Sequence, residues 1–217
     1  MTANRRTVLG AALTAPLLAQ FTGTASAAAD EKWGTISDAW VEVRWTTQVQ
    51  AELDRWEAVV EAVAPAELVK DGGGTAVRFP VRSGQGDPSL ANPAKASGDG
   101  VLDGGITVRT PKGNAQVVNL QSVLKDGLAS GKCVLNGVDL GHRSVFRCAV
   151  SEGSLTTGTA AVGKPLKVRI DKVPLHATPE ALAVYTATLG ASASAFTADT
   201  VLAYVTAEGV YTPPKPS

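Results

Sequence analysis

The sequence predicts a mainly β protein, an antiparallel β-sandwich of the immunoglobulin-like type that carries two short α-helices. Three observations lead to this prediction. Valine, threonine and alanine are abundant, and 22 glycines among 217 residues supply the turns that many short strands need. From residue 71 onward the pattern is that of strands, interrupted by one well-marked helix. The other helical segment lies near residue 50, directly after the first strand.

The first 27 residues have the pattern of a twin-arginine export signal. Arg5 and Arg6 form a basic pair, an apolar stretch follows, and Ala25-Ser26-Ala27 has the small-residue form of a cleavage site. The apolar stretch falls short of the about 20 residues that a spanning helix needs. The alternative is an ordinary secretory signal that happens to contain two arginines. On either interpretation we expect a secreted, extracellular protein made of residues 28–217.

The remaining chain has the size of a single domain with a proline-rich tail at 212–217. The full chain has 20 basic and 20 acidic residues, and the predicted signal removes two arginines, which leaves a net charge of −2. No basic run of five or more residues occurs, so we expect no nucleic-acid partner. The tail contains no hydrophobic segment, so we expect no membrane anchor.

The first strand is predicted at 39–45, where Val41 and Val43 share one face and Trp40 and Glu42 the other. Helical spacing follows over 46–56, with Val49, Leu53 and Trp56 on one side. Residues 57–64 could extend this helix or begin a strand, and Pro65 ends either one. We predict that the helix is short and that a strand follows it.

The later elements are predicted from turns and alternation. Helix 178–190 is the best marked, because Thr178 is a suitable N-cap, Pro179 suits the first helical position and Gly190 suits the end. A turn at 71–74 and a long polar loop at 83–100 separate the strands. The predicted strands are 75–81, 101–109, 116–123, a hairpin over 132–148, 166–173 and 200–206.

Cys133 and Cys148 are the two cysteines of the chain, and an even pair in an exported protein predicts a disulfide. A hairpin that turns at Leu140-Gly141 places the two cysteines opposite each other, within the range of a disulfide. A zinc site is excluded by the ligand count, because His142 is the one histidine near the pair. We therefore expect a covalently closed hairpin and no metal.

Five residues are candidate ligand contacts. Trp40 and Trp45 belong to a segment that holds all four tryptophans, although a place in the core explains them equally well. Asp87 and Asp99 lie in the long loop, and Asp103 follows in a glycine-rich stretch. Asp99 and Asp103 suggest a calcium loop, but the spacing of a calcium-binding motif is missing, and glycine turns account for the segment.

Several short stretches together resemble the HtaA-type β-rich domain of secreted and cell-surface actinobacterial proteins. They are TAVRFPVRSG (75–84), GVLDGGITV (100–108), VVNLQSVLKDGLASGKCVLNG (117–137) and VPLHATPEALAVYTATLG (173–190). Some such domains bind haem through a tyrosine in the first helical segment, supported by a histidine in the strand matching GVLDGGITV. Here the first segment has no tyrosine and that strand no histidine, so we expect no cofactor.

The expected function is the non-catalytic binding of an extracellular or cell-envelope component. No G-x-S-x-G nucleophile motif is present. His142 lies near Asp139 and Ser144, but three neighbours on a hairpin tip cannot take up the geometry of a catalytic triad. His176 precedes the N-cap of a helix, where we expect a structural or solvated histidine. Two alternatives stay open. One is an extracellular hydrolase that uses an unrecognised pair of carboxylates, and the other is a haem or metal carrier.

Overall fold

A computed structural model describes residues 33–72, 74–86, 98–123, 127–148, 150–158, 164–190 and 195–214. All of them belong to one structural unit, which spans 32–217. The predicted export signal, with Arg5 and Arg6, lies outside the described residues, as does Asp87.

Strands make up most of the described chain, and two α-helices and one 3-10 turn complete it. The elements are β1 (Gly34–Trp45), α1 (Thr47–Arg55), β2 (Val59–Val63), β3 (Glu67–Asp71), β4 (Gly74–Gly86), β5 (Gly98–Leu102), β6 (Gly105–Thr110), β7 (Gly113–Val123), β8 (Leu128–Leu135), β9 (Val138–Cys148), η3 (Val150–Glu152), β10 (Ser154–Thr157), β11 (Leu166–Ala177), α2 (Pro179–Leu189) and β12 (Ala203–Thr212).

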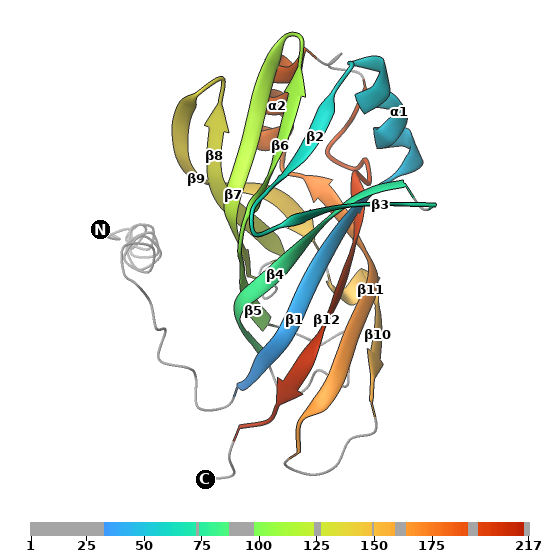
Figure 1. Ribbon diagram of the computed structural model, residues 1–217, viewed down its shortest axis with the longest axis vertical. Coiled ribbons are helices and arrows are strands. Elements are labelled where there is room, and N and C mark those ends of the chain that lie inside the picture. The colour runs from blue at the N-terminus through green and yellow to red at the C-terminus, as the bar shows by residue number, and fades with distance from the viewer. Residues whose placement is uncertain are drawn as a thin grey trace, which may run out of the picture. The chain divides into compact units, whose positions relative to one another are not determined.

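The strands form one antiparallel sheet in the order β2-β6-β7-β5-β4-β1-β12-β11-β9-β8, with β3 added to β4 and β10 to β11 (Figure 1). An additional pairing joins β8 to β7, so the sheet closes on itself. Eight strands (β7, β5, β4, β1, β12, β11, β9 and β8) therefore form a ring. The prediction of a mainly β, antiparallel fold with two helices is confirmed, and its facing layers are parts of one continuous sheet.

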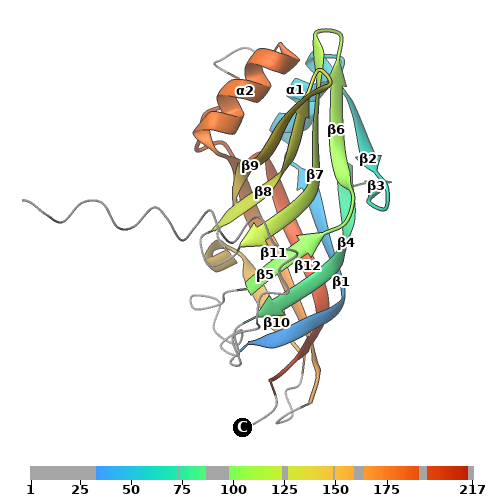
Figure 2. The same cartoon turned by 90° about the vertical axis from the view of Figure 1, so that its left-hand side faces the viewer.

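The core lies inside this ring. On β1, Val41 and Val43 face inward toward Phe79 and Val77 of β4, whereas Glu42 lies on the outer face beside Arg78. This alternation was predicted from the sequence and is confirmed. Both helices lie at the end of the sheet where β6 turns into β7 (Figure 2).

The second helix forms as its capping residues predict. The Thr178 hydroxyl accepts a hydrogen bond from the Ala181 N–H at 3.2 Å, Pro179 occupies the first helical position, and Gly190 ends the helix with a φ of 72°. The first helix is capped in the same way by Thr46, whose hydroxyl accepts from the Val49 N–H.

Residues 57–64 do not extend the helix but lead into a strand, as predicted. The N–H of Ala58 bonds to the Leu53 carbonyl at 2.8 Å and Glu57 adopts a φ of 52°, so the helix ends there and β2 begins at Val59. The strand predicted at 101–109 is instead divided in two, because Gly104, with a φ of 88°, makes a turn between β5 and β6.

The hairpin formed by β8 and β9 turns at Asn136-Gly137, whereas Leu140-Gly141 was predicted. Leu135 pairs with Val138 across the turn, and Asn136 and Gly137 have φ values of 49° and 82°. Both central residues thus take the positive φ that two-residue hairpins require, a conformation that asparagine and glycine adopt readily. Bulges farther along β8 and β9 shift the pairing again, so the register of the hairpin differs from the predicted one.

The predicted disulfide is wrong, because Cys133 and Cys148 are both free and buried. In the observed register Cys133 lies opposite Gly141, and Cys148 lies beyond Arg147, which pairs with Leu128 at the far end of β8. Cys133 and Leu128 are five positions apart, which corresponds to about 16 Å along a strand. A disulfide requires Cα atoms less than about 7 Å apart.

Candidate ligand-binding cavity

A cavity of about 270 Å³ lies inside the ring of strands. At one end its wall consists of Leu53 and Trp56 from the α1 region, Leu182 from α2, and Phe196. Farther in, the wall is made by inward side chains of β1, β5, β7, β11 and β12, such as Val43, Leu102, Val117, Val173 and Ala203.

The packing of α1 positions the helix end of this cavity. Val49 and Leu53 are its buried residues and, with Phe196, form a second core cluster. The Trp56 ring meets Phe196 edge to face, with centroids 5.6 Å apart. Thr46 fixes the start of the helix, because its N–H bonds to the Leu202 carbonyl at 3.1 Å. The helix is therefore held against the segment that leads into β12.

The described residues that line the cavity carry no charge, and few of them are polar: Gln121, Thr186, Tyr185 and Cys148. Burial raises the pKa of Cys148 to about 12 and also raises that of Tyr185. The Tyr185 hydroxyl lies 3.7 Å from the sulfur of Cys133. The Cys148 thiol and the Tyr185 hydroxyl therefore stay protonated at neutral pH, so this wall offers a neutral, apolar surface and no anionic nucleophile.

An unfilled apolar cavity is costly. At about 24 cal/mol for each Å³, a volume of about 270 Å³ corresponds to roughly 6 kcal/mol. That figure is comparable with the whole free energy of unfolding of many domains, roughly 5–15 kcal/mol. An apolar molecule that fills the space regains contacts with its wall, and engineered apolar cavities about half this size bind small hydrocarbons.

A smaller cavity of about 110 Å³ continues toward the opposite end of the sheet. Its wall contains side chains such as Ile36, Leu155 and Val168. Glycines of β4, β5 and β12 form much of the remainder: Gly84, Gly86, Gly98, Gly100 and Gly209. Glycine in a strand leaves room for another group to approach the backbone.

The two candidate tryptophans have different surroundings. Trp45, at the end of β1, packs against both core clusters and lines the large cavity. Trp40 lies beside the smaller cavity, and the guanidinium carbons of Arg78 and Arg169 lie 4.5 and 5.8 Å from its ring centroid. The structure therefore assigns Trp45 to the interior and places Trp40 between two cations.

The two described candidate aspartates, Asp99 and Asp103, have different partners. Asp99, on β5, borders the smaller cavity, where the Gln85 amide nitrogen lies 3.5 Å from its carboxylate. Asp103 follows β5 and accepts a hydrogen bond from Arg82 Nε at 2.6 Å. Within the described ranges no three His, Cys, Asp or Glu residues are grouped so as to hold a metal ion.

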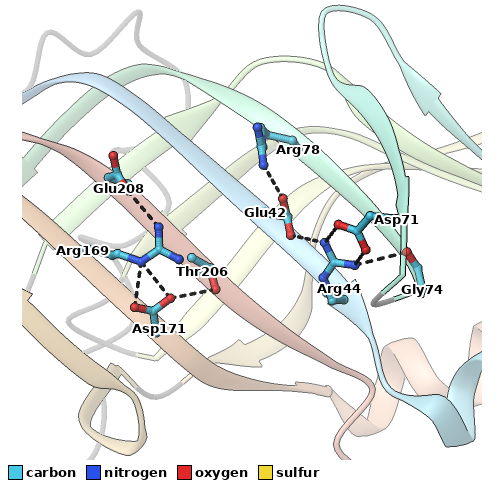
Figure 3. A network of polar contacts seen from close by, with 9 residues as sticks. All are labelled: Glu42, Arg44, Asp71, Gly74, Arg78, Arg169, Asp171, Thr206 and Glu208. Carbon is cyan, nitrogen blue, oxygen red and sulfur yellow. Dashed lines mark hydrogen bonds and ion pairs between the residues drawn. The ribbon is translucent and has the colours of Figure 1, made fainter.

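The outer face of β1, β4, β11 and β12 carries a network of ion pairs (Figure 3). Burial by itself raises the pKa of Glu42, but hydrogen bonds from Arg78 and Arg44 outweigh it, so the pKa lies below its usual value. Arg44 also binds Asp71, and Arg169 binds Asp171 and Glu208. Each of these carboxylates is paired with an arginine, so we interpret the network as a support for the strand face.

Apart from Trp45, the residues that line the large cavity were not singled out from the sequence as ligand contacts. One sequence signal of the cavities lies in β12. Every second residue of this strand points inward, and these inward residues have short side chains or none: Ala203, Val205, Ala207 and Gly209. The pattern Gly84-x-Gly86 followed by Gly98-x-Gly100 is a second signal, because the two pairs lie opposite each other in the sheet.

The positions at which the HtaA resemblance places the haem ligands carry neither a tyrosine nor a histidine in this chain. Helix α1 contains no tyrosine, and no histidine occurs at Asp103-Gly104-Gly105. The ring nitrogen Nδ1 of His176 lies 3.1 Å from the Thr200 carbonyl, and neither His176 nor His142 lines the cavity.

The thiols provide a direct check of the corrected pairing. We expect no reaction of the native protein with Ellman's reagent within minutes, because both sulfurs are buried and the pKa of each thiol is raised by burial. After unfolding in guanidinium chloride without reductant, two thiols per chain should titrate. The absence of thiols in the unfolded protein would instead demonstrate a disulfide.

No protein-family model matches the chain, and no curated protein sequence matches it. Among solved structures, it is similar to the crystal structure of the C-terminal domain of HtaA from Corynebacterium glutamicum, with a TM-score of 0.46 and 12% identity, over 82% of this chain and 99% of that one. The predicted resemblance is thus confirmed as a weak structural similarity. Within the described part of the chain, no helix has the length and apolar character needed to cross a membrane.

Proposed function

We propose that this protein is a non-catalytic extracellular binding protein that holds an apolar ligand inside its curled sheet. The observation that carries the proposal is the cavity of about 270 Å³, whose described lining is uncharged and almost entirely apolar. Ligand sites in proteins are typically concave and mostly apolar, with a small number of polar groups. The pattern of the first 27 residues supports the extracellular location.

Binding fits this cavity better than hydrolysis does. A glycosidase requires two carboxyl groups that converge on the substrate, and the described residues of the cavity wall include no acid, base or histidine. The carboxylates of Glu42, Asp71 and Glu208 lie instead in ion pairs with arginines on the outer face. The protonated thiol of Cys148 is the single thiol in this wall.

Reducing the cavity volume tests the proposal. Ala203 is 1% exposed and lines the cavity, so Ala203→Leu places three additional carbon atoms there. We expect the free energy of unfolding to rise by about 1 kcal/mol, and binding of the neutral dye N-phenyl-1-naphthylamine to weaken at least tenfold. Fluorescence titration measures the binding, and urea unfolding measures the stability.

Two further variants complete this test. Ala183→Leu is the matched control, because Ala183 is exposed on α2 and does not line the cavity, and it should leave dye affinity unchanged. Ala129→Leu fills the cavity from β8 if the Ala203 variant does not fold. Failure of the wild-type protein to bind the dye, or equal affinity in all three variants, would refute the proposed function.

A further inference from the structure

The interior holds two adjoining cavities rather than a single chamber. The large and small cavities share five lining residues, Val41, Leu102, Val150, Ile170 and Ala207. Along β1 the wall runs from Trp45 at the large cavity to Ile36 at the small one. These two residues are nine positions apart, which corresponds to about 30 Å of strand.

Glycines form part of the wall of the small cavity. Gly98, Gly100 and Leu102 lie on one face of β5, since they alternate along a strand without an extra residue. A Cβ atom added at Gly100 would meet a single atom within 4 Å, the Ser83 carbonyl oxygen at 3.8 Å. A side chain therefore has room at Gly100, and the glycine leaves that space in the small cavity.

We propose that the ligand is a molecule with an unbranched alkyl chain, which extends from the large cavity into the glycine-lined small cavity. This inference rests on the proposed function and specifies its ligand class. A chain of methylenes is long and thin enough to enter both cavities and matches the apolar wall of the large one, whereas a compact ring system fills the large cavity alone. The uncharged described lining of the large cavity matches the alkyl part and leaves any polar head outside it.

The volumes set the length of the chain. If each methylene takes about the 30 Å³ of a water molecule in the liquid, the large cavity of about 270 Å³ accommodates about nine. The small cavity of about 110 Å³ accommodates about three or four more on the same basis. The preferred chain therefore has about twelve carbons.

Competition between the dye and a series of linear alcohols from hexanol to hexadecanol tests this length. We expect affinity to rise about threefold to fourfold with each added methylene and to level off near twelve carbons. Dodecanoate and dodecylammonium, tested at the same length, should compete with similar affinity if the chain is what is recognised. Affinity that follows the head group and ignores chain length would overturn the inference.

Filling the space at Gly100 tests whether the ligand chain extends into the small cavity. Gly100→Val should move the plateau from about twelve to about nine carbons, and leave hexanol and the dye bound as before; Gly100→Ala is the milder variant if the valine variant does not fold. Gly72→Val is the control, because a Cβ there meets nothing within 4 Å and Gly72 lines neither cavity.

The outcomes separate the two proposals. If the wild-type protein binds neither the dye nor any alcohol, the proposed function itself fails. If the dye and short alcohols bind, but the plateau is unchanged in Gly100→Val or cyclohexylmethanol binds as tightly as dodecanol, the alkyl-chain inference fails and the function stands.

Discussion

Replacement of Gly104 by alanine is expected to destabilise the protein by about 4 kcal/mol. Gly104 has a φ of 88°, which strains a residue with a side chain, and the new Cβ atom would lie 2.4 Å from the Val63 carbonyl oxygen and 2.6 Å from the Ala66 nitrogen. The figure combines backbone strain of roughly 1–3 kcal/mol with overpacking of roughly 1–3 kcal/mol. Urea unfolding followed by circular dichroism measures the change.

The neighbours of Gly104 are backbone atoms of the turn between β2 and β3, so they are unable to move aside as a flexible side chain does. Gly72→Ala is the matched control, since it is exposed and its Cβ meets nothing within 4 Å. We expect this control to change stability by less than about 0.5 kcal/mol. An equal effect of the two substitutions would contradict the close approach at Gly104.

Phe79→Ala is expected to lower the free energy of unfolding by about 3–5 kcal/mol. Phe79 on β4 is 0% exposed, and among the described residues it is the largest fully buried side chain. Its loss removes apolar contacts with the core cluster that contains Val41 and Val43. Guanidinium chloride denaturation, with the slope held equal between variants, gives the difference.

Phe79 does not line either cavity, so its replacement should change the stability of the protein without changing its affinity for the dye. The folded fraction of Phe79→Ala should bind the naphthylamine dye with wild-type affinity. Phe79→Leu should restore more than half of the lost stability, because it keeps most of the buried volume. Val59→Ala is the surface control, since Val59 is 53% exposed; a loss as large as that of Phe79→Ala would contradict the assigned core.

Local signals were sufficient for the elements whose ends are marked by side chains. Helix α2 follows from Thr178, Pro179 and Gly190, and the two faces of β1 follow from the alternation around Val41 and Val43. β3 and β10 were missed, because a five-residue and a four-residue strand are too short to show a period. Each forms by pairing with a longer strand that lies beside it.

The cysteine pairing shows how a turn decides register. Both Asn136-Gly137 and Leu140-Gly141 end in glycine, but asparagine tolerates a positive φ far better than leucine does. The four-residue displacement of the turn moves Cys133 away from Cys148 by most of the length of β8. The expectation of an oxidising exterior favoured the disulfide and outweighed this turn signal.

The candidate site was predictable only in part. Trp45 was identified and lies on the large cavity, but its other walls come from strands far apart in sequence, such as β1, β7 and β11. A cavity exists only when small inward residues of several strands meet at one level. Whether these residues meet depends on the register of the strands and on the pairing of β7 with β8. The pattern of residues within one strand specifies neither of them.

The β7–β8 closure also bears on how the protein avoids association through its strand edges. Each strand of the ring has hydrogen-bonded neighbours on both sides along at least part of its length, so few backbone groups are left to template aggregation. β2, β3 and β10 each pair on one side and have at most five residues. The outer part of β9 carries Asp139 and Arg143, and charged side chains at such an edge discourage a foreign strand.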